Sequence, residues 1–384
     1  MGTTAVRQFD TDTTESRLFA IQLMTFLASG GLILVGIALL FAGGELFVAG
    51  SVALALLLGI PQIVIGLTVV SLGTSAPELF VSLLSTLQGG DDLAVSNIVG
   101  SNIFNVLIVL GMSALVVPLR VKSRLVKRDV PLLLGVSMAV WGMASGGRLT
   151  WQAGLALLTA LVINLIWEMR TAKEHPEEGD DDAEEGRSSG PVAAGRLAAG
   201  LVLLVLGSQL LVRGATDAAT ALGVSQTVIG LTIVAAGTSM PELVTSLVAA
   251  YRGKADLAIG NVVGSNLLNQ VVILGLCATV SGGSGLAVDP VMVNRDLPVM
   301  VLTTLACLPI FWTGGVITRL EGGLLVGMYG LYLIEQLLLH SAPTLSDEYR
   351  LALLVGVLPL LLVFLAWQVL RWRQLRRRPD PGLL

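Results

Sequence analysis

The segment that decides the fold is GTSAPEL at residues 73–79, because it returns as GTSMPEL at residues 237–243. Both segments lie inside a longer repeat: residues 62–111 align with residues 226–275 at a constant offset, and roughly half of the positions are identical. A period of this length identifies two copies of one structural unit within the chain. The sequence around the two copies must therefore form two structurally similar halves.

Apolar stretches of about twenty residues, each long enough to cross a hydrocarbon core of about 30 Å, recur along nearly the whole chain. Hydrophobic residues make up 54% of the 384 residues and charged residues 13%, whereas soluble domains carry about a quarter charged residues. The sequence therefore predicts an all-α polytopic membrane protein and excludes a soluble domain of any size. The predicted spans are residues 28–56, 61–88, 93–118, 129–146 and 149–169, then 193–221, 225–251, 256–281, 296–314 and 318–340, and an eleventh at 350–371.

The spans divide the chain into two halves of five helices each, with further segments before, between and after them. The predicted units are an N-terminal extension at 1–27, a first repeat at 28–170, a cytoplasmic linker at 171–192, a second repeat at 193–340, and an extra C-terminal helix with a basic tail at 341–384. The linker is acidic and too polar to bury a core. A regulatory calcium-binding loop is the alternative, although its acids lack the regular spacing of an EF-hand. The first residues show no signal peptide.

Orientation is predicted from the positions of Lys and Arg in short loops. Three basic clusters are placed inside: residues 120–128, the pair Arg252 and Lys254, and the tail from Arg371 to Arg378. This arrangement puts the N-terminus outside and predicts a multi-pass protein of the cell membrane. Because five spans separate equivalent points, the second repeat enters the membrane from the opposite side. Inverted repeats are typical of secondary transporters, which bind their substrates near the midplane where the repeats meet.

Each copy carries a proline within an apolar segment, Pro77 or Pro241. A proline inside a helix removes one donor and pushes against the carbonyl four residues earlier, here that of Gly73 or Gly237. We expect the helix to bend or open at both places. At membrane depth a freed carbonyl needs another helix, water or a ligand as its partner, and a cation is such a ligand.

Polar side chains surround each break. Thr74 and Ser75 precede Glu78 by four and three residues, so we expect the hydroxyls and the carboxylate to share one helix face. The second copy repeats this arrangement with Thr238, Ser239 and Glu242. In the next span a polar stripe at helical spacing is formed by Asn97, Ser101 and Asn105 in one copy and by Asn261, Ser265 and Asn269 in the other.

These ligands are all oxygen atoms, which suit a hard cation such as calcium better than zinc or copper. Taken singly, a membrane proline bends a helix, and a membrane Asn or Ser joins helices. Their joint repetition around a buried acid favours a functional site. Glu168, Glu321 and Glu335 lie near predicted span ends, where we expect them to face water. No nucleic-acid binding is indicated.

At these residues the chain resembles the prokaryotic type of the sodium/calcium exchanger branch of the calcium/cation antiporter superfamily, whose repeats carry GTSxPE and GSNxxN patterns. The resemblance implies that Glu78 and Glu242 are central ligands shared by calcium and sodium. It implies that the sites are completed by Thr74, Ser75, Ser101, Asn105, Thr238, Ser239, Ser265 and Asn269, with backbone carbonyls from Ser71 and Ala235. Some potassium-dependent relatives carry Asp at the position of Asn269, so the amide argues against potassium coupling.

The sequence thus predicts an antiporter, not an enzyme, that exchanges Ca²⁺ for Na⁺ by alternating access, works as a monomer in the lipid bilayer and needs no cofactor. The first and sixth spans, with small-residue patches at 42–44 and 207–208, would slide past the core. Calcium/proton exchange is the alternative, since a buried Glu can carry a proton; potassium-dependent sodium/calcium exchange is another. An intramembrane hydrolase lacks a His in a span to act as base, and a passive channel would not need inverted repeats.

Overall fold

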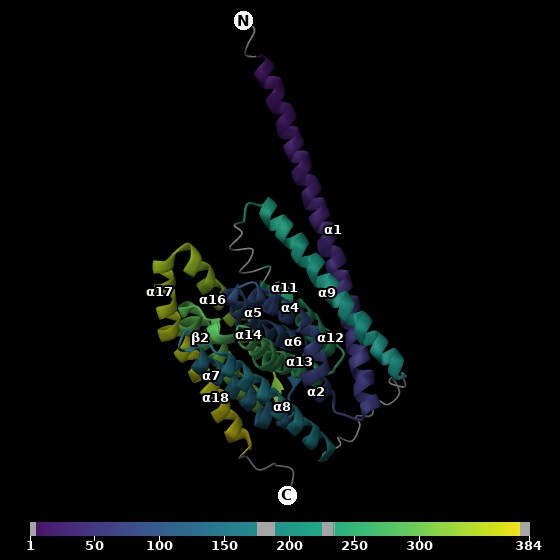
Figure 1. Ribbon diagram of the computed structural model, residues 1–384, viewed down its shortest axis with the longest axis vertical. Helices are drawn as coiled ribbons and strands as arrows, with labels where there is room; N and C mark the ends of the chain where they lie inside the picture. Colours follow the sequence, from purple (N-terminus) through teal and green to yellow (C-terminus); the bar gives the residue numbers. More distant parts are fainter. Residues whose placement is uncertain (1–4, 175–188, 225–232, 234, 377–384) are drawn as a thin grey trace.

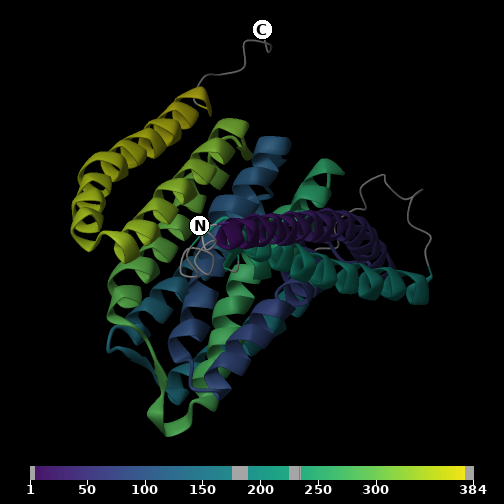
Figure 2. The same cartoon turned by 90° about the horizontal axis from the view of Figure 1, so that it is seen from above.

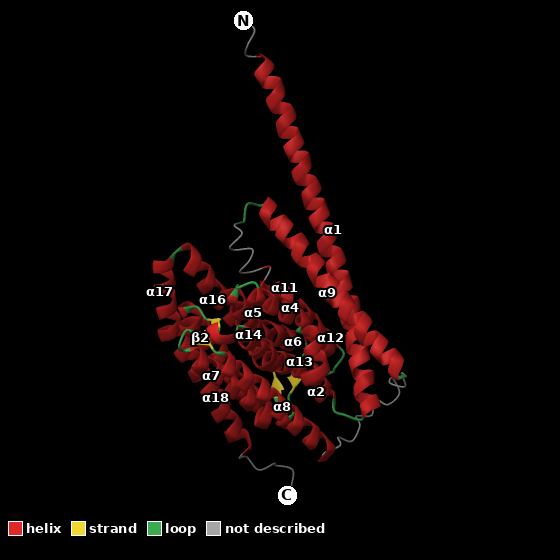
Figure 3. Cartoon of the chain, in the orientation of Figure 1, coloured by secondary structure: helices red, strands yellow, loops and turns green. Residues whose placement is uncertain are grey.

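The computed structural model describes residues 5–174, 189–224, 233 and 235–376, and it is almost entirely helical (Figure 3). Among these residues, seven helical segments are long and apolar enough to cross a membrane, and a bent pair at Gln62–Thr74 and Ala76–Leu87 forms an eighth candidate. This architecture confirms the polytopic helical class. The count of ten spans plus one stays a prediction.

The helices follow the predicted spans in order. Those of the first half are α1 Ala5–Leu58, α2 Gln62–Ile65, α3 Ser71–Thr74, α4 Ala76–Leu87, α5 Asp91–Phe104, α6 Gly111–Val116, α7 Val130–Ala144 and α8 Trp151–Glu174. Those of the second half are α9 Gly190–Ala221, α11 Ala235–Thr238, α12 Met240–Tyr251, α13 Ala255–Leu268, α14 Gly275–Val280, α15 Leu297–Trp312, α16 Arg319–Ser341, α17 Pro343–Ala352 and α18 Leu358–Arg376. Most of the predicted linker and the second-copy motif at 229–232 lie outside the described residues.

In the part of the chain that the structure describes, six complete π-helical segments interrupt or begin these helices. They are η1 Gly66–Val70, η2 Asn105–Leu110, η3 Leu125–Asp129, η5 Asn269–Leu274, η7 Met292–Asp296 and η8 Leu353–Val357, and a short 3-10 turn, η6, covers Gly282–Ser284. Because η2 joins α5 to α6 and η5 joins α13 to α14, the third and eighth predicted spans are each one continuous helix. Their π-helical segments begin at equivalent positions of the two repeats.

Two short antiparallel ribbons connect the halves. β1 Leu119–Arg120 pairs with β4 Val316–Ile317, and β2 Arg148–Leu149 pairs with β3 Leu286–Ala287. Each ribbon joins a loop of the first repeat to a loop of the second, so the repeats interlock instead of forming separate lobes.

α1 and α9 lie side by side along one flank of the bundle (Figures 1 and 2). Glycines spaced by seven residues line their contact: Gly36, Gly43 and Gly50 on α1, and Gly200, Gly207 and Gly214 on α9. A Cβ at Gly43 would lie 2.9 Å from the carbonyl oxygen of Gly200, and one at Gly200 would lie 2.8 Å from that of Gly43. The backbones therefore touch, as small residues permit in membranes. We call this row the glycine seam.

The glycine seam alters the interpretation of the two small-residue patches. Gly43 and Gly207 face the partner long helix, whereas Gly44 faces Val244 and Val248 on α12. One glycine of each patch thus holds α1 to α9, whereas Gly44 and Ser208 contact the bundle.

The expectation that Glu321 and Glu335 face water is wrong, because both are buried, at 2% and 8% exposure. Glu321 caps α16, where its carboxylate accepts from the backbone N–H of Thr318 at 2.7 Å. Glu335 is covered by α17, whose Arg350 lies beside it. The side chain of Glu168 lies outside the described residues.

Candidate cation-binding site

Two broken helices form the centre of the molecule. Between α3 and α4, Ser75 has φ −81° and ψ 8°, and the flanking helices differ in direction by 49°. Between α11 and α12, Ser239 has φ −90° and ψ 8°. Pro77 and Pro241 each lie in the first turn of the following helix, a position where a missing N–H costs nothing. The predicted opening of both helices is confirmed.

The acidic residues of the two breaks are completely buried. Glu78 and Glu242 have 0% exposure. Ser239 donates to Glu78 Oε1 at 2.9 Å, and Ser75 donates to Glu242 Oε1 at 2.9 Å. The sequence predicted that each hydroxyl shares a face with its own carboxylate, and it did not indicate that each serine would bind the carboxylate of the other repeat.

α5 supplies a further hydroxyl to this centre. Ser101 donates to Glu78 Oε1 at 3.4 Å and accepts from Ser239 Oγ at 3.1 Å. One carboxylate oxygen of Glu78 therefore receives hydroxyls from both repeats. These two hydrogen bonds hold Oε1 of Glu78, whereas Oε2 has no hydrogen-bond partner among the described residues.

Several buried oxygen atoms at the predicted ligand positions have no hydrogen-bond partner among the described residues. They are Glu78 Oε2, Glu242 Oε2, Asn105 Oδ1, Ser265 Oγ and Asn269 Oδ1. Asn105 and Asn269 open the π-helical segments η2 and η5, and such segments frequently mark functional sites. A buried acceptor without a donor is costly, and a set of carboxylate, amide and hydroxyl oxygens is the ligand type of hard cations.

The chain matches the family described as sodium/calcium exchanger protein over residues 28–169 and 192–338. The chain belongs to this family. It is 35% identical to the inner membrane protein YrbG of Escherichia coli K12, over 82% of this chain and 100% of that protein. It is 29% identical to the sodium/calcium exchanger MaX1 of Methanosarcina acetivorans, over 79% of this chain and 97% of that protein.

Solved structures agree with the sequence relatives. A structure of the sodium-calcium exchanger NCX_Mj, soaked with Na⁺ and zero Ca²⁺, superposes with a TM-score of 0.69 at 32% identity and covers 80% of this chain and 99% of that one. This sodium/calcium exchanger family member is therefore a cation antiporter and a multi-pass protein of the plasma membrane.

The candidate site includes two asparagines that the sequence placed in the polar stripe but not among the ligands. Thr74 donates to Asn261 Oδ1 at 3.1 Å, and Thr238 lies 3.5 Å from Asn97 Oδ1. The amide groups are held in turn by serines one helical turn beyond each glutamate: Asn97 donates to Ser82 and Asn261 to Ser246, both at 3.0 Å. Each of these serines follows its glutamate by four residues, and this repeated spacing could have identified them from the sequence.

The backbone carbonyls predicted as ligands lie beside the breaks. The carbonyl of Ser71 accepts from the N–H of Ser75 at 3.0 Å, while the hydroxyl of Ser71 donates to the Asn261 carbonyl at 3.0 Å. Ala235 begins α11, and its side chain lies outside the described residues. Both positions therefore lie one helical turn before the serine at the break, Ser75 or Ser239.

A group of amides behind Asn269 was missed altogether. Asn269 donates to Asn102 Oδ1 at 3.1 Å, and Asn266 donates to the Asn102 carbonyl at 3.0 Å. Gln270 donates to Ser137 on α7 at 3.0 Å, whereas the equivalent residue of the first repeat is Val106. This group orients Asn269 and makes the two halves of the candidate site unequal.

Proposed function

We propose that this antiporter exchanges Ca²⁺ for Na⁺ by alternating access at the site between the two broken helices. The observation that carries the proposal is the pair of fully buried carboxylates, Glu78 and Glu242. Each has one oxygen bound by a serine, and the other oxygen has no hydrogen-bond partner among the described residues. The named relatives MaX1 and NCX_Mj, both sodium/calcium exchangers, support the same ion pair.

The ligand set follows from position and chemistry. Glu78 and Glu242 would be shared by both ions, with further oxygens from the side chains of Thr74, Ser75, Ser101, Asn105, Thr238, Ser239, Ser265 and Asn269 and from the carbonyls of Ser71 and Ala235. Calcium takes six to eight oxygen ligands in flexible geometry. Two glutamates balance one divalent charge, so a bound calcium ion leaves the site nearly neutral within the bilayer.

Coupling follows from competition for these oxygens. Sodium ions that occupy the same carboxylates and hydroxyls exclude calcium, and calcium excludes them. Each ion set would therefore leave the site before the other binds. The amide at Asn269 supplies no third charge, which favours sodium exchange without potassium.

Access would alternate through movement of α1 together with α9. The glycine seam brings the backbones of these helices into contact, so they would move as one body along the flank of the bundle. Against the bundle, α1 contacts Val244 through Gly44 and contacts Gly73 through Phe47. Each contact has a glycine on one side, so side chains do not interlock there and sliding would be possible.

The test is radioactive calcium uptake into proteoliposomes that are loaded with sodium and diluted into sodium-free buffer. Uptake that requires internal sodium supports the proposal. Uptake that ignores sodium but follows a pH gradient would replace it with calcium/proton exchange, which adjacent buried carboxylates also permit. No calcium uptake under either gradient would contradict both.

A further inference from the structure

α17 and α18 enclose a cavity that lies apart from the cation site. Its volume is about 630 Å³, and its lining residues come from η7, α15, α16 and the C-terminal segment of α17, η8 and α18. The match to the exchanger family ends at residue 338, so the helices that close this cavity are an addition to the family fold.

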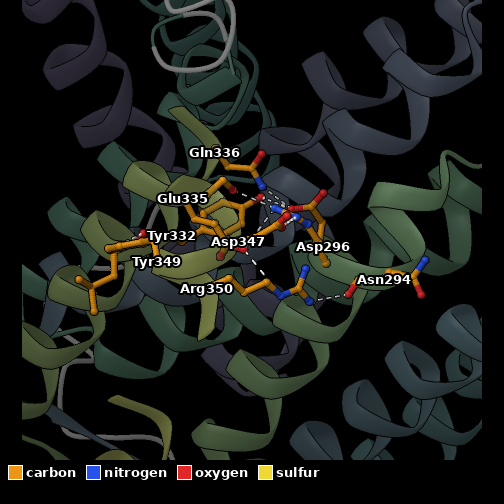
Figure 4. A network of polar contacts seen from close by, with 11 residues as sticks. Asn294, Asp296, Tyr332, Glu335, Gln336, Asp347, Tyr349 and Arg350 are labelled. Carbon is orange, nitrogen blue, oxygen red and sulfur yellow. Dashed lines mark hydrogen bonds and ion pairs between the residues drawn. The ribbon is translucent and has the colours of Figure 1, made fainter. Parts of the chain in front are cut away.

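The C-terminal helices are attached to the bundle at two ends of this cavity. At the α17 end, Arg295 donates to Asp347 Oδ1 at 2.6 Å and Arg350 donates to the Asn294 carbonyl at 2.6 Å (Figure 4). At the other end, Gln368 of α18 donates to Glu321 of α16 at 3.1 Å. Only 6% of the most apolar stretch within Pro343–Leu370 is buried in the protein. The cavity therefore lies between the two places where the C-terminal helices are attached to the bundle.

The walls of the gap are almost wholly apolar. Leu302 and Leu305 on α15, with Leu354 and Leu362 on the C-terminal side, are between 38% and 53% exposed. In a bilayer, unfilled space beside such side chains forfeits dispersion contacts, so hydrocarbon is the natural occupant. The volume lies within the range of roughly 300–1,000 Å³ that is usual for small-molecule sites.

The polar residues of the cavity lie at one end. Glu335 Oε1 is 3.8 Å from Arg295 Nη1 and 3.9 Å from Arg350 Nε, distances too long for hydrogen bonds. The Nε group of Arg350 therefore keeps its capacity to donate to a ligand. Arginine is well suited to phosphate because its planar group offers several donors at once.

The charges at this end are mixed, with two arginines and three carboxylates close together. Arg295 and Arg350 face Glu335 and Asp347, while the neighbouring Asp296 is already bound by Tyr332 at 3.0 Å and by Gln336 (Figure 4). A purely anionic head group would meet the two carboxylates at close range. A head group that carries both a phosphate and an ammonium matches the mixed charge.

We propose that this cavity binds a zwitterionic phospholipid with a primary ammonium group, of the phosphatidylethanolamine type. One acyl chain lies along α15 between α16 and α18, the phosphate accepts from Arg350, and the ammonium donates to Glu335 or Asp347. The lipid completes the contact of the C-terminal helix with the bundle.

Lipid binding to the full-length, delipidated protein in detergent tests this. Phosphatidylethanolamine, phosphatidylcholine and phosphatidylglycerol with identical acyl chains are added separately, and retained lipid is counted by native mass spectrometry alongside the melting temperature. We expect phosphatidylethanolamine to be retained preferentially and to raise the melting temperature most. Equal retention of all three, or preference for phosphatidylglycerol or phosphatidylcholine, would overturn the head-group assignment.

Two variants locate the site. Arg350→Gln should weaken phosphatidylethanolamine binding about tenfold, because one hydrogen bond between charged groups is lost. Leu361→Trp should block the acyl chain, because Leu361 lines the cavity. The control is Arg213→Gln, which removes an exposed arginine from α9. If Arg350→Gln binds lipid as the control does, the proposal fails, whether or not the tryptophan variant folds.

Discussion

At the scale of residues, the exchange of hydroxyls between repeats is the feature that ties the two halves of the site together. Ser75 binds Glu242, and Ser239 binds Glu78. Each carboxylate is therefore oriented in part by a hydroxyl of the other half. A change in one broken helix reaches the carboxylate of the other through a single hydrogen bond, which provides a direct physical route for coupling the two sides of the site.

The carboxylates themselves give the sharpest test at this scale. Glu78→Gln and Glu242→Gln keep the shape of the side chain but remove one negative charge from a fully buried site. Breaking a buried charge interaction costs about 3–5 kcal/mol, which corresponds to at least a hundredfold. We expect calcium uptake in sodium-loaded proteoliposomes to fall by at least that factor in each variant. Unchanged uptake in either would remove that glutamate from the site.

The serines should show a smaller and symmetrical effect. Ser75→Ala and Ser239→Ala each remove one hydrogen bond to a charged group, worth about 1.5–3 kcal/mol. We expect the calcium concentration for half-maximal uptake to rise about tenfold or more in both. Ser96→Ala is the control, because Ser96 donates only to its own helix at Leu93. A large effect in one serine variant and none in the other would contradict exchange across the repeats.

At the scale of elements, α9 contacts a broken helix directly. Ser208 of α9 donates to the carbonyl of Gly237, which is the carbonyl that Pro241 deprives of its helical donor. The equivalent position in the first repeat is Gly44, which has no hydroxyl. One flank of the site is therefore fastened to a long helix by a side chain, and the other is not.

Ser208→Ala should shift the balance between the two access states. The lost hydrogen bond is worth about 1 kcal/mol, so we expect about a fivefold change in the ratio of apparent calcium affinities measured from the two sides of the membrane. Ser51→Ala is the control, because Ser51 donates to Phe47 of its own helix. Equal changes from both sides would indicate a purely structural role for Ser208.

The glycine seam predicts strong intolerance of even one methyl group. A Cβ at Gly43 would lie 2.8 Å from the backbone nitrogen of Leu204, so Gly43→Ala must push α1 from α9 at a cost of about 1–3 kcal/mol. We expect a lower melting temperature and less transport. Gly195→Ala on α9, where nothing lies within 4 Å of the added atom, should lower neither. A Gly43→Ala variant as stable as Gly195→Ala would contradict the close contact.

At the scale of the whole molecule, the recurring apolar stretches were enough to predict the membrane class. Pro77 and Pro241 were enough to predict the two broken helices, because each proline acts within its own segment. Contacts between distant segments were not predictable in the same way. Whether Ser75 turns to Glu78 or to Glu242 depends on how the repeats interlock. Glu335 lies at a span end, where water was the expected partner, but α17 covers it. Sequence periodicity carries no information about such a covering helix.

Motion of α1 and α9 as one body can be tested by fastening α1 to the bundle. A Cβ at Gly44 would lie 3.0 Å from a methyl group of Val244, so Gly44→Cys with Val244→Cys brings two sulfurs within reach of a disulfide. Because the native Cys277 and Cys307 are buried, oxidation should join only the introduced pair. We expect oxidation to stop sodium-driven calcium uptake and reduction to restore it, with each single-cysteine variant unaffected by oxidant. Transport that continues after complete crosslinking would show that α1 stays fixed to α12 during exchange, and the access change would then have to arise within the bundle itself.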